Sequence, residues 1–186
     1  MKTVVLMVGP RGSGKTTYSQ EVVQRYPNVI LWSRDKVVQG KFGKVMFRKD
    51  DPALEEAMEY ADQQLKSLLR SADDDACIIL DLPIKMELRK ELIDFLRTFF
   101  GPIRIVCWYF TTSYDICSRW FFKKPWQERL LMDQVCYRLE YQYARLHLSK
   151  GVDYPGVSEY CGPNPDGFNL IRRIDPSNSN QEICFP

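Results

Sequence analysis

The chain alternates between short runs of apolar residues and longer segments in which apolar residues recur every three or four positions. The short runs are rich in Val, Ile and Leu, and they predict buried strands. They cover residues 2–8, 28–32, 76–80 and 103–110, and residues 168–174 can supply a last strand. Strands this uniformly apolar are typical of a parallel sheet covered by helices on both faces. The pattern therefore predicts an α/β fold with a five-stranded, mostly parallel sheet.

The segments between the runs have helical spacing. They predict helices over residues 15–26, 51–71, 83–100, 114–122 and 127–150, and a loop or short helix after residue 35. Two of these helices carry an apolar stripe that is expected to face the core. In the second helix the stripe is Ala53, Leu54, Ala57, Met58, Ala61, Leu65, Leu68 and Leu69. In the third it is Ile84, Leu88, Leu92, Phe95, Leu96 and Phe99.

The length of 186 residues suits one compact domain, because domains average roughly 150 residues. We expect a single unit over residues 1–186, with a helical lid at about 114–130 and a Pro/Gly-rich tail over 152–186. No apolar run reaches the ~20 residues that a membrane-spanning helix needs. The expected location is the cytoplasm, or the host cytoplasm if the chain is viral, without secretion and without a membrane as partner.

Cysteine and histidine usage excludes several kinds of chemistry. The six cysteines are too widely spaced for a zinc knuckle or a C-x-x-C redox pair, which favours reduced thiols. The chain has one histidine, His147, so a His-based catalytic triad or a multi-histidine metal site is excluded. The net charge is 26 − 24 = +2, so any affinity for a polyanion must come from local patches.

The residues between the first strand and the first helix carry the strongest chemical signal. Residues 9–16 match the phosphate-binding pattern G-x-x-x-x-G-K-[ST] at every fixed position, in the strand-to-helix context that this motif requires. Its glycines let backbone N–H groups approach phosphate oxygens, and the helix N-terminus adds partial positive charge. Lys15 is expected to reach the β- and γ-phosphates, and Thr16 to ligate Mg²⁺. The predicted nucleotide-binding residues are Gly9, Arg11, Gly12, Ser13, Gly14, Lys15, Thr16 and Thr17.

A nucleotide site leaves kinases, ATPases and GTP-binding switches open. The chain has no Asn-Lys-x-Asp run for reading guanine, and motor ATPases are longer, which favours a kinase. Asp35, just past the second strand, is the predicted general base; the alternative is a helix cap. Asp81, at the end of the third strand, is predicted to hold Mg²⁺ through water or to touch the acceptor, and it too has a capping alternative.

Two basic segments are candidates for phosphate contacts. Residues 119–129 hold four bases against one acid, and Arg119 and Lys123 would project from one helix face toward ATP phosphates. Residues 34–49 hold six bases against one acid, which suits contacts with a nucleic-acid backbone. The predicted acceptor-binding residues are Arg34, Lys36, Lys41 and Lys44. Each segment has the alternative of a solvated basic surface.

The phosphate loop, Asp35, Asp81 and the pair Arg119 and Lys123 together resemble the 5′-kinase module of viral polynucleotide kinases, over about residues 1–150. The resemblance implies the P-loop kinase fold, ATP with Mg²⁺ as donor, Asp35 as general base, and Lys15, Thr16, Arg119 and Lys123 as ligands of the donor phosphates. Lys123 stands where that family usually has arginine, which keeps the charge but loses bidentate contact.

The sequence departs from that family on the acceptor side. The arginine that the family places three residues after the base is Val38 here, and the hydroxyl residue after the second aspartate is Leu82. A second group of viral P-loop kinases resembles the same layout: those that phosphorylate 5-hydroxymethyluracil within DNA, as a step toward hypermodified thymidines. The favoured acceptor is therefore this hydroxymethyl group. A 5′-hydroxyl end of nucleic acid, a free nucleoside or nucleotide, and a non-enzymatic nucleotide-binding regulator remain alternatives.

Overall fold

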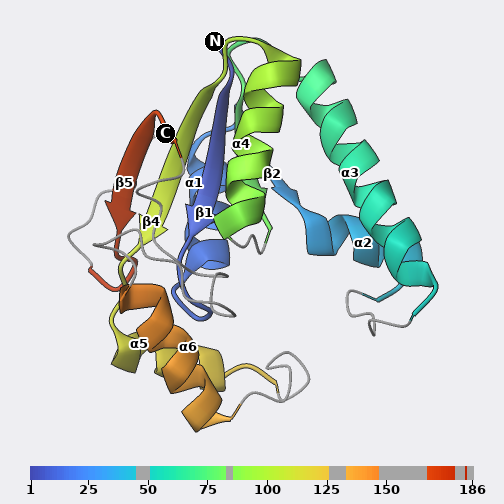
Figure 1. Cartoon of the computed structure of the whole chain (residues 1–186). Coiled ribbons are helices and arrows are strands. Elements are labelled where there is room, and N and C mark those ends of the chain that lie inside the picture. Colours follow the sequence, from blue (N-terminus) through green and yellow to red (C-terminus); the bar gives the residue numbers. More distant parts are fainter. Residues whose placement is uncertain (45–50, 83–85, 126–132, 147–166, 179–182, 184–186) are drawn as a thin grey trace.

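The computed structural model describes residues 1–44, 51–82, 86–125, 133–146, 167–178 and 183. The strands are β1 (Thr3–Val8), β2 (Val29–Ser33), β3 (Cys77–Asp81), β4 (Arg104–Phe110) and β5 (Leu170–Ile174). The helices are α1 (Lys15–Arg25), α2 (Arg34–Phe42), α3 (Ala53–Ser71), α4 (Met86–Phe100), α5 (Tyr114–Phe122) and α6 (Gln134–Leu146). Figure 1 shows the strands side by side, with α4 and α1 on opposite faces of the sheet and α5 and α6 together beyond its carboxyl edge.

The sheet has the strand order β2-β3-β1-β4-β5, and every pairing is parallel. The α/β prediction is confirmed, and "mostly parallel" becomes wholly parallel. Because parallel strands end at one edge, the residues that follow β1, β2, β3 and β4 gather there. Ser33 is in register with Asp81, which places the segment after β2 beside the end of β3.

Strand residues alternate between two buried layers, which explains why the strand sequences are apolar throughout. Val4 and Leu6 pack toward α3 and α4, together with Leu80 of the neighbouring strand. Val5 and Met7 pack on the other face, where Tyr18 and Val22 of α1 cover the sheet. The sheet is therefore covered on both faces, so the site is expected at its carboxyl edge.

The predicted stripe of α3 is confirmed at its centre, since Ala57, Ala61, Leu65 and Leu69 are buried. The prediction for α4 is confirmed at Leu96, which is buried, and in part at Leu92, which packs against the core, but it is wrong at Leu88 and Phe99. Leu88 and Phe99 are 50% and 68% exposed, whereas the buried face carries Arg89, Ile93 and Leu96. Because α4 is apolar around much of its circumference, spacing alone could not select the inward face. Ile84 lies outside the described residues.

One element boundary differs from the prediction, and the choice between a loop and a short helix after residue 35 is decided. The segment after Ser33 is the regular helix α2, which ends at Gly43 with a left-handed φ of 70°. The helix predicted over 127–150 does not run through Asp133, whose side chain accepts the Cys136 amide at 2.7 Å and caps α6. Residues 127–132 and 147–150 of that prediction lie outside the described residues.

The described cysteines Cys77, Cys107, Cys117 and Cys136 are free thiols. Burial raises the pKa of the Cys77 thiol to about 12, which keeps it protonated and unreactive. No helix in the described ranges combines the length and apolar character needed to cross a membrane.

Candidate active site

The phosphate loop, residues 9–16, joins the central strand β1 to α1 and opens at the carboxyl edge of the sheet. Gly12 and Gly14 have left-handed φ values of 75° and 86°. A Cβ atom on Gly12 would lie 2.4 Å from the Cys117 carbonyl oxygen and 2.9 Å from Phe121 Cβ, both on α5. Glycine at position 12 is therefore required both by the turn and by the close approach of α5.

Replacing Gly12 with alanine is expected to destabilise the fold by about 2–4 kcal/mol, since a left-handed alanine costs about 1–2 kcal/mol and overpacking adds about as much. Gly40 is the matched control, because it lies within α2 with nothing within 4 Å of an added Cβ. Gly40→Ala is expected to stabilise by about 0.5–1 kcal/mol. Urea unfolding followed by circular dichroism measures both. Equal stability of Gly12→Ala and the wild type would contradict the described contact with α5.

The polar side chains of the loop differ in burial and in hydrogen bonding. Lys15 is partly buried, and its Nζ donates hydrogen bonds to the Gly9 and Pro10 carbonyl oxygens, each at 2.8 Å. Thr16 and Thr17 are exposed at the start of α1. Ser13 is fully buried, and within the described part of the chain its Oγ has no hydrogen-bond partner. Ser13 can therefore meet a phosphate only through its backbone.

Two carboxylates lie beside the loop. Asp81 is the last residue of β3, and its register partner in β2 is Ser33. Asp35 lies two residues beyond Ser33, in the first turn of α2. The Asp35 side chain is 57% exposed. Ser33, not Asp35, occupies the N-cap position of α2, so the capping alternative for Asp35 does not describe its place in the fold. Asp35 is open to an incoming substrate.

The charges around Asp81 show which groups converge. Burial raises the pKa of Asp81 above its ordinary value, the negative charge of Asp35 adds to this, and the positive charges of Lys15, Lys36 and Lys124 oppose it. Asp81 is thus within electrostatic range of the phosphate loop, of α2 and of the residue that follows the α5 cap. These groups form one site at the carboxyl edge of the sheet.

Asp81 is expected to lower the stability of the nucleotide-free protein as pH rises. A carboxyl whose pKa is higher in the folded state binds more protons there than in the unfolded chain, so stability falls from about pH 4 up through the raised pKa. At pH 7 Asp81→Asn is therefore expected to have a higher Tm than the wild type. The difference should vanish below about pH 4. Thermal unfolding across pH measures this, with the exposed Asp62→Asn expected to follow the wild type.

The lid cations are placed at and beyond the end of α5. Arg119 lies in its last turn and Lys123 is its C-cap, and both are exposed. The lysine whose charge acts on Asp81 is the next residue, Lys124. Lys123 follows the last residue of α5, Phe122, and as the C-cap it keeps helical φ and ψ values of −73° and −19°, so its four-residue spacing to Arg119 is preserved.

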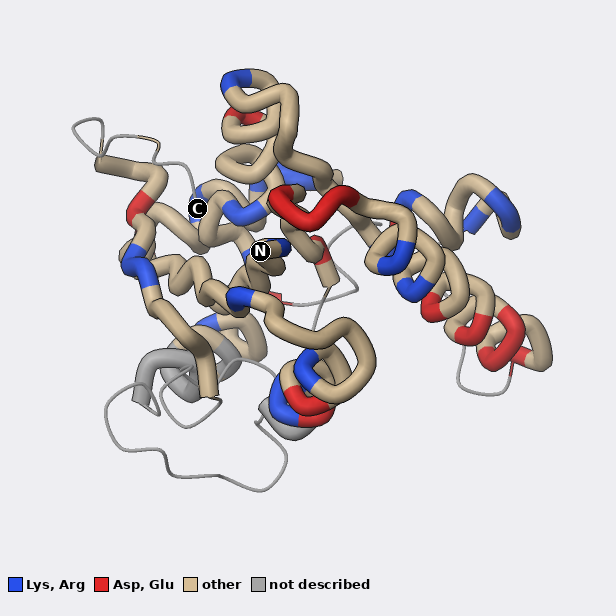
Figure 2. The backbone as a smooth tube through the Cα atoms, turned by 90° about the horizontal axis from the view of Figure 1, so that it is seen from above, with Lys and Arg blue, Asp and Glu red and all other residues tan. Residues whose placement is uncertain are grey.

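The four predicted acceptor residues separate into two pairs. Arg34 Nε lies 3.7 Å from Asp35 Oδ1, and the positive charge of Lys36 lowers the pKa of Asp81. Arg34 and Lys36 therefore lie beside the two carboxylates. Lys41 instead contacts Glu56 Oε1 at 3.3 Å, and Lys44 contacts Asp51 Oδ2 at 2.6 Å. Figure 2 shows the acidic stretches along α3 and at the turn that follows it. Lys41 and Lys44 are therefore paired with acidic residues near the start of α3 and do not lie beside the two carboxylates.

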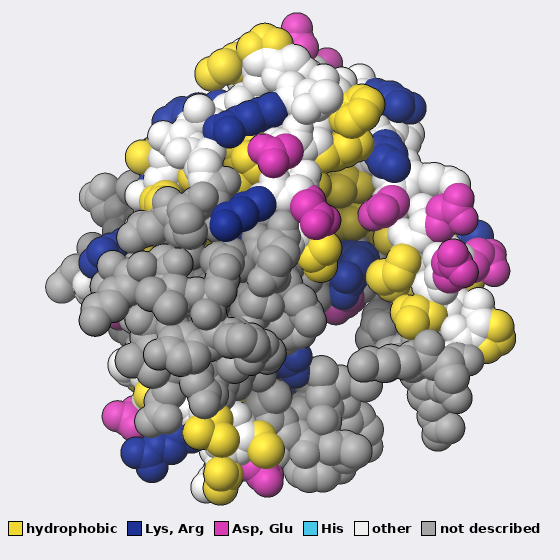
Figure 3. Space-filling model, viewed as in Figure 1, with side chains coloured by type: hydrophobic (Ala, Val, Ile, Leu, Met, Phe, Trp, Pro, Cys, Tyr) yellow, Lys and Arg dark blue, Asp and Glu magenta, His cyan; other side chains and the backbone are white. Residues whose placement is uncertain are grey.

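A hollow lies between α4 and the arm formed by α2 and α3 (Figure 3). Hydrophobic side chains line its walls, and basic side chains lie deeper within it. The partly buried apolar residues packed against the core on this face of the sheet include Val37, Phe42, Met58, Leu82 and Leu92. Val38, which replaces the arginine expected by resemblance, is 1% exposed and packs in the core. Position 38 thus contributes no cation to this hollow.

The oxygen ligands at the site fit Mg²⁺. The exposed Thr16 hydroxyl and the Asp81 carboxylate flank the loop, and Mg²⁺ prefers a few protein oxygens together with water and substrate phosphates. Within the described ranges no cluster of three His, Cys, Asp or Glu residues could hold a metal without a phosphate. The arrangement suits a metal that arrives with a nucleotide.

Sequence reasoning found no role for two tyrosines of α6. Tyr137 donates its hydroxyl hydrogen to the Arg11 carbonyl at 2.6 Å, and Tyr141 donates to the Thr112 carbonyl at 2.8 Å. Helical spacing marks both as apolar-face residues, but their hydroxyl contacts depend on long-range packing. No local signal could have revealed them.

Comparisons with known proteins show the family and the fold of the chain. A family profile described as an AAA domain, AAA_33, matches residues 4–146. No curated protein matches the chain. Among solved structures, a proposed kinase from Chloroflexus aurantiacus aligns with a TM-score of 0.59 at 15% identity, over 98% of this chain and 90% of that one.

Two further solved structures share the fold. Shikimate kinase from Bacteroides thetaiotaomicron aligns with a TM-score of 0.55 at 15% identity, over 97% of this chain and 92% of that one. A chain of the Pnkp1/Rnl/Hen1 RNA repair complex aligns with a TM-score of 0.57 at 17% identity, over 76% of this chain and 43% of that one. The predicted P-loop kinase fold is confirmed by these likenesses.

Proposed function

The chain belongs to the AAA_33 family of AAA domains, and from this premise we propose that it is an ATP-dependent kinase that transfers the γ-phosphate to a hydroxyl group carried by DNA. The observation that carries the proposal is the exposed Asp35 carboxylate beside Asp81 and the phosphate loop. A carboxylate in this position can accept the proton of an acceptor hydroxyl while the phosphoryl group is transferred in line. A binding protein that only senses nucleotide has no need of such a group.

Each residue has a distinct role in the proposed reaction. The loop N–H groups and Lys15 hold the β- and γ-phosphates, and Thr16 and Asp81 hold Mg²⁺ directly or through water. Mg²⁺, when bound, offsets the negative charge of the phosphates. Asp35 orients the acceptor hydroxyl and takes its proton. Arg119, Lys123 and Lys124 are available to offset the charge that spreads over the transferred phosphoryl group.

The favoured acceptor is the 5-hydroxymethyl group of 5-hydroxymethyluracil in DNA, in a DNA hypermodification reaction. Arg34 and Lys36 lie beside the carboxylates and suit phosphate-backbone contacts. The core position of Val38 supports an acceptor without a clamped terminal phosphate, since no cation stands there. An internal base needs no such clamp.

A 5′-hydroxyl polynucleotide kinase is the second candidate. The likeness to a chain of an RNA repair complex favours it, because the shared region spans most of this chain. The likeness to shikimate kinase keeps small acceptors, such as free nucleosides and nucleotides, as a third possibility to be tested alongside.

Transfer of label from γ-labelled ATP tests these acceptors directly. The substrates are DNA with a 5′-hydroxyl, DNA with a 5′-phosphate, and 5′-blocked DNA with internal 5-hydroxymethyluracil, accompanied by 5′-hydroxyl RNA and free nucleotides. Label in the blocked, modified DNA supports the proposal. Label confined to 5′-hydroxyl ends selects the second candidate, and label only in free nucleotides selects the third. Tight ATP binding without transfer to any acceptor would support a nucleotide-binding regulator instead.

A further inference from the structure

Backbone carbonyl groups in and beside the phosphate loop are held from outside the loop by three hydroxyl groups. Tyr137 donates to the Arg11 carbonyl at 2.6 Å, and Thr112 Oγ1 donates to the Ser13 carbonyl at 3.0 Å. Tyr141 donates to the Thr112 carbonyl at 2.8 Å, which in turn fixes the residue that holds Ser13. We call Thr112, Tyr137 and Tyr141 the hydroxyl latch. It ties the loop to the segment after β4 and to α6.

The anchored carbonyls determine where the loop amides point. In a trans peptide the C=O of one residue and the N–H of the next point in opposite directions within one rigid plane. Holding the Arg11 carbonyl outward directs the Gly12 N–H inward, and holding the Ser13 carbonyl outward does the same for the Gly14 N–H. Successive inward N–H groups form the concavity that binds phosphate oxygens.

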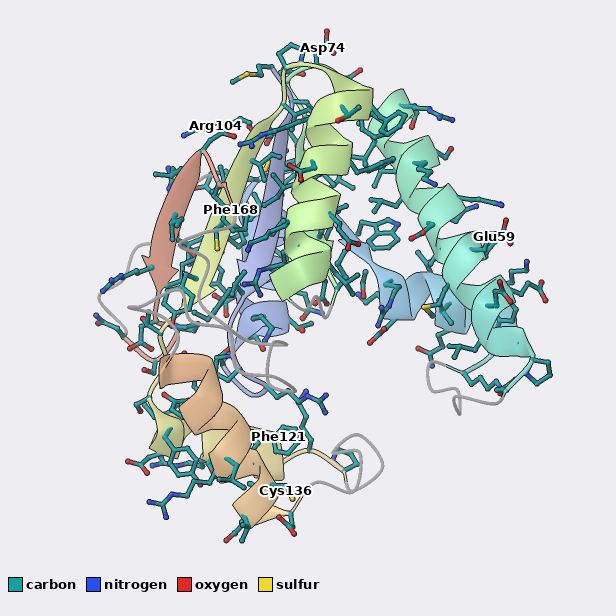
Figure 4. The ribbon with its side chains drawn as sticks, in the orientation of Figure 1. Glu59, Asp74, Arg104, Phe121, Cys136 and Phe168 are labelled. Atoms are coloured by element: carbon teal, nitrogen blue, oxygen red, sulfur yellow. The ribbon has the colours of Figure 1, made fainter. Side chains whose placement is uncertain are left out.

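The hydroxyl latch is buried and shielded from water. Thr112 and Tyr137 are fully buried, and Tyr141 is 8% exposed. The Tyr137 ring stacks on Phe121 with centroids 4.7 Å apart and planes 13° apart, and Phe121 itself abuts Gly12. Figure 4 labels Phe121 in the group of side chains that α5 and α6 share. Hydrogen bonds in such surroundings do not compete with water, so they hold the peptide planes firmly.

We propose that Thr112, Tyr137 and Tyr141 are positioning residues that preorganise the Gly12 and Gly14 amides for the polyphosphate of a nucleoside triphosphate. This inference rests on the nucleotide site of the proposed function. The latch acts on the phosphates and not on the base, so it is expected to affect ATP and inorganic tripolyphosphate alike. Its effect appears in ligand affinity, because the loop otherwise has to be ordered by the ligand at a cost in binding free energy.

Tyr137→Phe tests the latch, since it removes only the hydroxyl and keeps the ring stack. Tyr114→Phe is the matched control: Tyr114 belongs to the same aromatic cluster, with its ring 6.1 Å from that of Tyr137, and its hydroxyl makes no hydrogen bond in the described part of the chain. Calorimetric titration is expected to show about ten-fold weaker binding of both ATP and tripolyphosphate by Tyr137→Phe. Tyr114→Phe is expected to bind as the wild type does. Equal affinity of Tyr137→Phe and wild type overturns the latch.

Thr112→Val is a second variant that loses one hydroxyl without changing shape, for use if Tyr137→Phe fails to fold. The amide resonances of Gly12 and Gly14 provide a readout that needs no ligand. They are expected to shift in Tyr137→Phe and Thr112→Val but not in Tyr114→Phe, and unchanged resonances overturn the latch. If the wild type binds neither ligand, the proposed nucleotide site is wrong, and the resonances still decide whether the latch orients the amides.

Discussion

Lys15→Ala is expected to lower the rate of phosphoryl transfer by about a thousand-fold. Lys15 is the cation of the phosphate loop, and a preorganised charged donor at a developing negative charge contributes about 10²–10³-fold or more to the rate. Its Nζ lies at the mouth of the loop, where it donates to the Gly9 and Pro10 carbonyls. An arriving γ-phosphate exchanges these neutral acceptors for a charged one, so the ammonium needs only a short movement.

The control for Lys15→Ala is Lys2→Ala. Lys2 also donates through Nζ to a backbone carbonyl, that of Leu69 at 2.7 Å, but at the opposite end of the sheet. Both variants lose hydrogen bonds of the same kind, so both are expected to remain folded with similar small losses of stability. Initial rates with γ-labelled ATP should fall only in Lys15→Ala. A comparable loss in Lys2→Ala would indicate that unfolding, not chemistry, explains the result.

Asp35→Asn is expected to reduce kcat by about 10²–10⁴-fold with little change in the affinity for ATP. Asparagine keeps the size and polarity of the side chain but cannot accept a proton from the acceptor hydroxyl. Because Asp35 is exposed and lies outside the phosphate loop, its loss leaves the donor site intact. The expected signature is therefore a loss in kcat with an unchanged KM for ATP.

Glu55→Gln is the control for Asp35→Asn. Glu55 is an acidic residue in the first turn of α3, as Asp35 is in α2, so both variants lose the same favourable charge at a helix N-terminus. Only Asp35→Asn is expected to lose transfer activity. Full activity of Asp35→Asn in single-turnover assays would remove the assignment of Asp35 as general base and leave Asp81 as the remaining carboxylate at the site.

The fold was largely predictable because its pattern is local. Buried parallel strands are apolar throughout, and the phosphate-loop motif marks the end of β1 by itself. The inward face of α4 was predictable only in part: Leu96 is buried as predicted, but the buried Arg89 takes a place that hydrophobicity assigns to its neighbour Leu88. The start of α6 was also missed, because it is set by a hydrogen bond from the Cys136 amide to the capping Asp133 side chain, which a hydropathy pattern does not register.

The candidate site was predictable where a residue's position in the sequence pattern indicates its place in the fold. Lys15, Asp35 and Asp81 follow from strand ends and from the motif, and the structure brings them together. The charge of residues 34–49 was a weaker guide, because a count of lysines does not reveal that Lys41 and Lys44 meet Glu56 and Asp51. Contacts of this kind depend on how α2 and α3 pack, which lies beyond the reach of charge arithmetic.

The fifth strand lies beyond the region that the family profile matches. β5 covers Leu170–Ile174, whereas the match ends at residue 146. β5 pairs with β4 along Val106–Phe110, and Pro176 beyond it lies 3.1 Å from where a Cβ of Gly14 would stand. A chain cut after residue 146 would leave the backbone N–H and C=O groups of β4 as an open, strongly apolar edge, which invites strand addition between molecules. The boundary of the family match is therefore not the boundary of the folding unit.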